Sequence, residues 1–301
     1  MKKTIKIITG PTASGKTAYA LEMAKHEDGV IINADSMQLY KDLPILSAHP
    51  SDTEKAQAPH KLYGVLDATD HCDAVKWADM AKQEIELCFK NNKTPILVGG
   101  TGFYLKALME GLSPIPEVPK DIRDFATKLQ QTTGNPAFHT LLSARDPEIA
   151  DKIDPYNTQR LIHAWEVLEA TGKPLSYWHS LPKEGPKASW EFDVIVLMPD
   201  REKLYQKIEK RFDQMLEQNA LDEVRVLSKR IKDGDVDEDA NINITLGFRP
   251  LRDYHQGTVT LEEAREKSVT DTRRYAKRQL TWVRHQIKQT GNVKSLTYMD
   301  I

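Results

Sequence analysis

Cysteine, long apolar runs and an excess of one charge are all missing or scarce in this sequence. The only two cysteines, Cys72 and Cys88, cannot build a disulfide framework or a cysteine metal site. No apolar run approaches the roughly 18 residues that a membrane-spanning helix needs. The apolar stretch at the N-terminus is too short for a signal peptide. We therefore expect a cytoplasmic protein with reduced thiols and no membrane segment.

The charge balance excludes a strong overall attraction to polyanions. Lys and Arg number 42 against 44 Asp and Glu, which gives a net charge of −2. A polyanionic partner must therefore meet a local basic patch. Hydrophobic residues make up 40% of the 301 residues, which is enough for a substantial core and excludes a disordered chain. The length indicates one large domain or two modest ones.

Short apolar runs alternate with helical patterns in the first third of the chain. Residues 5–9, 30–33 and 94–98 are typical of buried strands. Helical spacing follows at 16–25 and 73–91, and again after Gly99-Gly100 as far as Leu108. This alternation predicts an α/β fold with a parallel sheet.

The pattern changes after Ser113, where Pro114, Pro116 and Pro119 follow one another closely. From there to Gly172 the signals are helical, and a strand pattern returns only at 192–197. We predict a core made of 1–112 and 191–301, the second part mainly helical, and an inserted all-helical domain at 113–190.

Residues 10–17 match the phosphate-binding pattern G-x-x-x-x-G-K-[ST] between a predicted strand and a predicted helix. Glycines let the backbone wind around phosphates, and the N–H groups at a helix N-terminus attract anions. The pattern predicts a P-loop NTPase-like core. The expected diphosphate- or nucleotide-binding residues are Gly10, Pro11, Thr12, Ala13, Ser14, Gly15, Lys16 and Thr17, with the Thr17 hydroxyl as a ligand of Mg²⁺.

The Walker-B acid of ATPases is missing, because the strand at 94–98 runs into Gly99-Gly100-Thr101. The acid at a strand end near the loop is Asp35, which can serve the metal, act as a base, or only cap the following helix. A phosphate-binding loop also leaves the reaction open. The bound group could be a nucleotide that is hydrolysed, or an organic diphosphate whose pyrophosphate leaves.

Five segments together resemble the bacterial tRNA dimethylallyltransferases, in the same order and over nearly the whole chain. They are Gly-Pro-Thr-Ala-Ser-Gly-Lys-Thr at 10–17, Asp-Ser-Met-Gln-Leu-Tyr at 35–40, Gly-Gly-Thr-Gly-Phe-Tyr-Leu at 99–105, Gln-Arg at 159–160 and Tyr-Ala-Lys-Arg-Gln-Leu-Thr-Trp at 275–282. The resemblance implies transfer of the dimethylallyl group of dimethylallyl diphosphate to N6 of the adenosine just 3′ of the anticodon, with release of diphosphate and with Mg²⁺.

The resemblance also implies roles for individual residues. Asp35 accepts the N6 proton, and Lys16, Thr101 and Arg211 serve the diphosphate and the reaction centre. The implied tRNA contacts are Asp35, Ser36, Met37, Gln38, Thr101, Arg123, Gln159, Arg160, Leu161, Ile162 and His163. His163 departs from the family, which usually has a basic residue there. Phe103 and Tyr104 are candidates for the prenyl pocket.

The C-terminal part carries the local basic patch. From 265 to 288 there are eight Lys or Arg against two acids, and helical spacing places Arg273, Arg274, Lys277, Arg278, Arg284 and Lys288 on one face. Such a face fits a phosphate backbone or a plain solvated surface. The resemblance favours the anticodon stem-loop of tRNA as partner of a monomer.

Three other functions stay open on the sequence. One is an isopentenyltransferase acting on free adenine nucleotides, which needs neither the insertion nor a basic helix. Another is a P-loop kinase of a small metabolite, which the missing Walker-B acid disfavours. The third is a non-catalytic RNA-binding protein with a structural nucleotide, which would not need Asp35.

Overall fold

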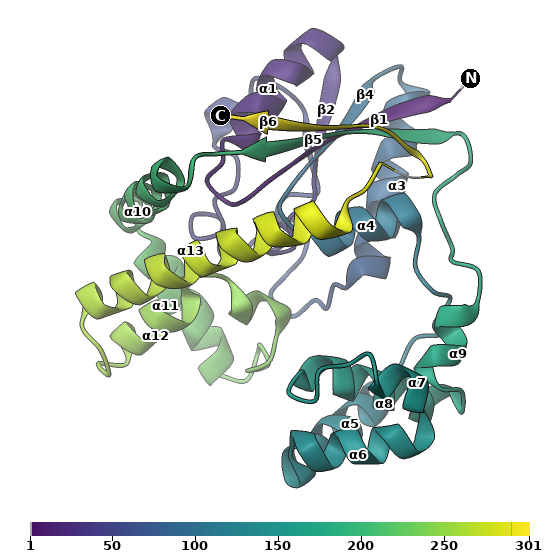
Figure 1. The fold of residues 1–301 in the computed structure, drawn as a ribbon. Helices are drawn as coiled ribbons and strands as arrows, with labels where there is room; N and C mark the ends of the chain where they lie inside the picture. The colour runs from purple at the N-terminus through teal and green to yellow at the C-terminus, as the bar shows by residue number, and fades with distance from the viewer. Residues whose placement is uncertain (1, 290) are drawn as a thin grey trace. The chain divides into compact units, whose positions relative to one another are not determined.

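A computed structural model describes residues 2–289 and 291–301 (Figure 1). Met1, which the predicted core includes, lies outside the described residues. The chain divides into two compact units, Met1–Glu110 with Pro186–Ile301, and Gly111–Gly185. The predicted insertion, 113–190, ends five residues later than the observed unit, which ends at Gly185. Trp190, which the prediction placed in the insertion, begins a strand of the first unit.

The first unit is built on a six-stranded sheet in the order β3-β2-β4-β1-β5-β6, with every pair parallel. The P-loop α/β fold predicted from the sequence is confirmed. The strands are β1 (Lys3–Thr9), β2 (Gly29–Asn33), β3 (His60–Lys61), β4 (Thr94–Val98), β5 (Trp190–Met198) and β6 (Val293–Asp300).

Helices cover both faces of this sheet. On one face α1 (Lys16–Glu27) packs its Ala20, Leu21 and Ala24 against Ile8 and Ile96. Because side chains alternate along a strand, Ile7 and Leu97 point to the opposite face. In Figure 1, α4 (Gly102–Glu110) and α13 (Leu261–Gln286) lie below the sheet and α1 lies above it.

The rest of the first unit is mostly helical. Its remaining elements are α2 (Asp52–Lys55), α3 (Ala74–Lys90), α10 (Arg201–Glu217), α11 (Ala220–Lys232), α12 (Phe248–His255) and the 3₁₀ turns η1 (Met37–Leu39) and η2 (Asn241–Ile244). Asp73 caps α3 by accepting from the Lys76 N–H. Trp77 and Trp190 are fully buried core residues.

Two strands, β3 and β6, were not predicted from the sequence pattern. β3 has only two residues. β6 belongs to the C-terminal part predicted to be mainly helical, and its polar residues alternate irregularly with apolar ones. Both lie at the edges of the sheet, where one side of the strand stays in solvent and a continuous apolar run is not required. A short, half-exposed edge strand therefore gives a weak sequence signal.

Parallel register brings the carboxyl ends of three strands to one place. Ile8 pairs with Val98, and Val98 pairs with Asn33. The segments that follow β1, β2 and β4 therefore leave the sheet side by side, at the edge where ligands bind in open α/β sheets.

The second unit is all-helical and has its own core. It contains α5 (Lys120–Thr133), α6 (Asn135–Arg145), α7 (Pro147–Ala150), α8 (Thr158–Thr171) and α9 (Leu175–Ser180). Phe138, Leu142, Leu161 and Val167 are fully buried in this core. The ends of α8 are well defined: Asn157 accepts from the Arg160 N–H, and the helix ends in a left-handed glycine at 172.

No helix within residues 2–289 and 291–301 has both the length and the apolar character required to cross a bilayer.

Candidate active site

The segment after β1 is a tight loop that leads into the N-terminus of α1. Gly15 has φ +84° and caps α1, a conformation that side-chain-bearing residues rarely adopt. No acidic residue stands in the first turn of α1. The positive end of that helix is therefore left to an external anion.

Two side chains of the loop lack the partner that a phosphate group supplies. The Ser14 hydroxyl is buried and has no hydrogen-bond partner among the described residues. The Lys16 ammonium donates to the carbonyl oxygens of Pro11, at 2.6 Å, and Gly10, at 3.1 Å. Neutral carbonyls are weak partners for an ammonium compared with phosphate oxygens, so this loop is arranged to take up an anion.

The segment after β2 holds Asp35. Its carboxylate accepts from the Met37 N–H at 3.1 Å. The side chain also lines a cavity of about 280 Å³, together with the loop. A capping role for Asp35 is therefore compatible with a role at the site: the carboxylate supports the turn that begins η1, and it also faces the cavity, where it could serve a metal or act as a base.

The segment after β4 packs tightly against the end of β2. Gly99 lies so close to Ala34 that an added Cβ would stand 2.1 Å from the Ala34 carbonyl carbon and oxygen. The Thr101 N–H donates to the Ala34 carbonyl at 3.2 Å. The Thr101 hydroxyl accepts from the Ser36 N–H at 3.0 Å. Thr101 thus fixes the chain immediately after Asp35.

A glutamine from α13 joins the phosphate loop to the segment after β4. The Gln279 carbonyl oxygen accepts from the Thr12 N–H at 2.8 Å, and its amide donates to the Gly100 carbonyl at 3.0 Å. One turn earlier, the Tyr275 hydroxyl interacts with Thr101 and Gln279. The buried face of α13 therefore holds two sides of the site in register.

The cavity collects cations around one carboxylate. Lys16, Lys207 and Arg211 line it, and Asp35 is the acid among its lining residues. Lys207 and Arg211 lie one turn apart on α10, so they share a face of that helix. The other walls are residues 12–17 of the loop, Gln38, Ser47, Ala48, Tyr63, Val98 and Gly99. This excess of positive charge fits a polyvalent anion such as a diphosphate.

The electrostatics of the cavity follow from burial. Burial lowers the pKa of Lys16 to about 8; the charge of Asp35 opposes this shift and that of Arg211 adds to it. Burial also lowers the pKa of Arg211, again opposed by Asp35. Burial raises the pKa of Tyr63, and the Asp35 charge raises it further. The two cations thus stand in a site where one carboxylate does not fully compensate them.

The residues present fit a magnesium ion held mainly by substrate oxygens. Among the described residues, no group of three His, Cys, Asp or Glu side chains is placed to hold a metal. Thr17 and Asp35 nevertheless both line the cavity and offer a hydroxyl and a carboxylate oxygen. Mg²⁺ is commonly bound by one or two protein oxygens together with phosphate oxygens and waters.

Known proteins share both the sequence and this architecture. The family model described as IPP transferase matches residues 38–286. This chain belongs to the IPP transferase family. It is 46% identical to the tRNA dimethylallyltransferase of Paramagnetospirillum magneticum over 93% of this chain and 88% of that one. It is 43% identical to the enzyme of the same name from Rhodospirillum centenum, over 95% and 90%.

Solved structures of the family agree. A full-length tRNA isopentenylpyrophosphate transferase of Bacillus halodurans has 33% identity and a TM-score of 0.67, and the match covers 100% of this chain and 90% of that one. A eukaryotic dimethylallyltransferase acting on tRNA has 28% identity and a TM-score of 0.83, over 99% and 74%. The predicted family is therefore confirmed.

The predicted site residues of the first unit divide into two groups. Residues 12–17 of the loop, Asp35, Gln38 and Arg211 line the cavity. The cavity lining does not include the other predicted residues, which bond to lining residues or to one another: Gly10, Pro11, Ser36, Met37 and Thr101. The Met37 sulfur accepts from the Thr245 hydroxyl at 3.3 Å, and Gln38 donates to the carbonyls of Ser47 and Ala48. Phe103 is exposed, Tyr104 stacks on Trp77, and neither lines the cavity, so their role in a prenyl pocket stays a prediction.

In the second unit, two predicted contacts share one buried acid. Glu166 of α8 accepts from Arg123 of α5 at 3.3 Å and lies 3.0 Å from the His163 ring nitrogen. Arg123 and His163 keep part of their surface in solvent, and Gln159 and Arg160 are exposed. Leu161 is fully buried in the helical core and Ile162 packs against it, so Leu161 offers no side-chain surface to a partner.

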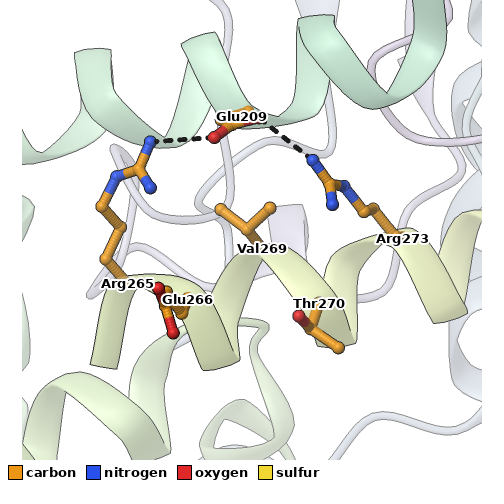
Figure 2. Close-up of a pocket in the computed structure, with 6 residues that line it drawn as sticks. All are labelled: Glu209, Arg265, Glu266, Val269, Thr270 and Arg273. Atoms are coloured by element: carbon orange, nitrogen blue, oxygen red, sulfur yellow. Dashed lines mark hydrogen bonds and ion pairs between the residues drawn. The ribbon is translucent and has the colours of Figure 1, made fainter. Parts of the chain in front are cut away.

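The basic face of α13 is narrower than the sequence predicts. Arg274, Lys277, Arg278 and Arg284 are exposed, as is Lys288 beyond the helix end. Arg273 instead turns toward α10. A second cavity of about 280 Å³ lies there, and Figure 2 shows Glu209 between the guanidinium groups of Arg265 and Arg273. Arg273 is placed by this ion pair, because α10 covers that side of α13.

Sequence reasoning assigned no role to Asn33, Tyr63, Lys207 or Gln279. Gln279 does stand in one of the family-like segments, but nothing in the sequence says what it touches. Lys207 has a weak signal, since it lies four residues before Arg211 on a predicted helix. The roles of Asn33 and Tyr63 can be recognised only in the structure, where the ends of β2 and β3 lie side by side.

Proposed function

We propose that this protein transfers the dimethylallyl group from dimethylallyl diphosphate to N6 of the tRNA adenosine 3′-adjacent to the anticodon, and that the cavity beside the loop is its active site. The single observation that carries the assignment of the site is the convergence of three cations, a phosphate loop and one carboxylate on one cavity. The cations suit a departing diphosphate, and the carboxylate suits an amine that must lose a proton.

The chemistry follows from these groups. The loop N–H groups, the Ser14 hydroxyl, Lys16 and Arg211 bind the diphosphate and stabilise the negative charge that grows on it as the allylic carbon–oxygen bond breaks. The N6 amine attacks the same carbon and forms the new carbon–nitrogen bond. Asp35 accepts the proton that the amine loses, and inorganic diphosphate leaves. Lys207 is placed to add a further cation.

The metal has a supporting role in this proposal. When bound, Mg²⁺ neutralises part of the diphosphate charge as a Lewis acid. Thr17 and Asp35 are the residues that offer it oxygen ligands. One Asp35 oxygen accepts from the Met37 N–H, so the other oxygen is available to the metal or to the incoming amine.

The tRNA is the acceptor we favour over free adenine nucleotides. The 111–185 unit and the exposed basic face of α13 provide surfaces that binding of a mononucleotide does not require. We propose that Arg123, Gln159, Arg160 and His163 of the insertion contact the anticodon stem-loop. An adenosine in a single-stranded loop is already unpaired, so its extrusion into the cavity costs little.

The test is transfer of labelled dimethylallyl diphosphate to unmodified tRNA, with AMP as the alternative acceptor. We expect N6-prenylated adenosine in the tRNA and at most trace product from AMP. An Asp35→Asn variant keeps the shape of the side chain and an oxygen acceptor for the Met37 N–H, but it cannot take the proton. We expect its kcat to fall by at least ~10²-fold with little change in tRNA affinity. Efficient prenylation of AMP, or near-normal kcat in Asp35→Asn, contradicts the proposal.

A further inference from the structure

Asn33, the last residue of β2, is fully buried two residues before Asp35. Its side-chain oxygen accepts from the Asp35 N–H at 2.8 Å. Its amide donates to the Asp35 carbonyl at 2.9 Å and to the Leu62 carbonyl at 3.0 Å. One side chain therefore satisfies both backbone polar groups of the residue that carries the cavity carboxylate.

This arrangement restrains Asp35 more strongly than an ordinary turn does. Two hydrogen bonds to one residue fix the peptide planes on both sides of its Cα, and those planes set the direction of the Cβ. The Asn33 backbone is itself held, because the Trp77 indole donates to the Asn33 carbonyl at 2.9 Å. The third bond, to Leu62, ties the same amide to the chain next to Tyr63, another wall of the cavity.

We propose that Asn33 is a positioning residue of the prenyl transfer, which holds the Asp35 carboxylate toward the reacting amine and acts on the rate through Asp35. The proposal rests on the proposed function of the site. Asparagine suits the position because it presents an acceptor and two donors at once. Aspartate has the same size, but its carboxylate faces two carbonyl oxygens that need donors, and alanine offers no hydrogen bond at all.

A double-mutant cycle tests whether Asn33 acts through Asp35. In the full chain, Asn33→Ala and the isosteric Asn33→Asp should each lower kcat by about 10²-fold, because a displaced catalytic group loses about that much rate. KM for dimethylallyl diphosphate should change less than about threefold, since the loop and Arg211 are held by other elements. In an Asp35→Ala background, Asn33→Ala should lower the residual single-turnover rate by less than about twofold.

Asn243 provides the matched control. It is also a buried asparagine, and its amide donates to the carbonyls of Asp237 and Glu238, outside the cavity lining. Asn243→Ala should lower the melting temperature as Asn33→Ala does, because each variant removes two hydrogen bonds from a buried side-chain amide to backbone carbonyls. It should leave kcat unchanged in both backgrounds.

The outcomes separate the two proposals. If the wild-type chain transfers no label to tRNA, the proposed function fails. If the wild-type chain does transfer it, but Asn33→Ala costs the same factor with and without Asp35, Asn33 acts on the fold in general and the inference is wrong. Normal kcat in both Asn33 variants also overturns it.

Discussion

Replacing Gly99 by alanine should damage catalysis through backbone displacement alone. Gly99 follows β4, and its added Cβ would stand 2.1 Å from the carbonyl carbon and oxygen of Ala34. Real Cβ contacts stay beyond about 3 Å, so the ends of β2 and β4 must separate by about 1 Å. The atoms that must move are backbone atoms of paired parallel strands, and they cannot rotate away as a side chain could.

The displacement acts directly on Asp35, the next residue after Ala34. It should also stretch the bond from the Thr101 N–H to the Ala34 carbonyl, now 3.2 Å, and the bond between Thr101 and Ser36. A shift of this size in a catalytic group costs about 10²-fold in rate. Forced overpacking of a core typically costs about 1–3 kcal/mol of stability. We therefore expect both a lower kcat and a lower melting temperature.

The assay is single-turnover transfer to tRNA at a temperature where the variant is folded, with circular dichroism to establish the fold. Gly234→Ala is the control, because Gly234 has φ +77° and no atom within 4 Å of the added Cβ. The left-handed backbone should cost it roughly 1–2 kcal/mol of stability, with no effect on kcat. Wild-type kcat in folded Gly99→Ala would refute the role we give to this close contact.

Three further changes test other parts of the site. Because burial lowers the pKa of Lys16 to about 8, the free enzyme should lose the ammonium charge above that pH. KM for dimethylallyl diphosphate should then rise by up to tenfold per pH unit. Lys16→Arg should abolish this rise around pH 8–9. Gln279→Glu keeps an acceptor for the Thr12 N–H but leaves the Gly100 carbonyl without a donor, which should cost about 1–3 kcal/mol in chemical denaturation; an unchanged free energy of unfolding contradicts the bridge. Glu209→Gln removes the charge between Arg265 and Arg273, and because the groups are partly exposed the loss should be about 1 kcal/mol or less; a loss of the same size in high salt would show that it is not electrostatic.

The lowered pKa of Lys16 also predicts how the stability of the fold changes with pH. Its ordinary pKa is 10.5, so between pH 8 and 10.5 the unfolded chain binds more protons at this residue than the native one. The contribution of Lys16 to stability therefore rises with pH through that window. Bound diphosphate should reverse the effect, because a nearby anion favours the charged form.

The sequence by itself determined the local features of this protein. The loop at 10–17 lies between a buried strand and a helix, as its pattern of glycines and lysine predicts. The caps of α8 and the apolar run at 30–32 in β2 also follow from short-range chemistry. Five separated segments were enough to name the family, since their combination is far more specific than any one of them.

Only the tertiary structure decided which of these segments meet, and which face each helix shows. Asn33, Leu62 and Gln279 reach the site from different elements, and hydrogen bonds between such distant positions leave no periodic trace in the sequence. Arg273 carries the same charge as Arg274 on the same helix, yet α10 packs beside one of them and solvent surrounds the other. Periodicity fixes the angle between two side chains on a helix, but the neighbouring element decides whether that angle points to a partner, a cavity or water.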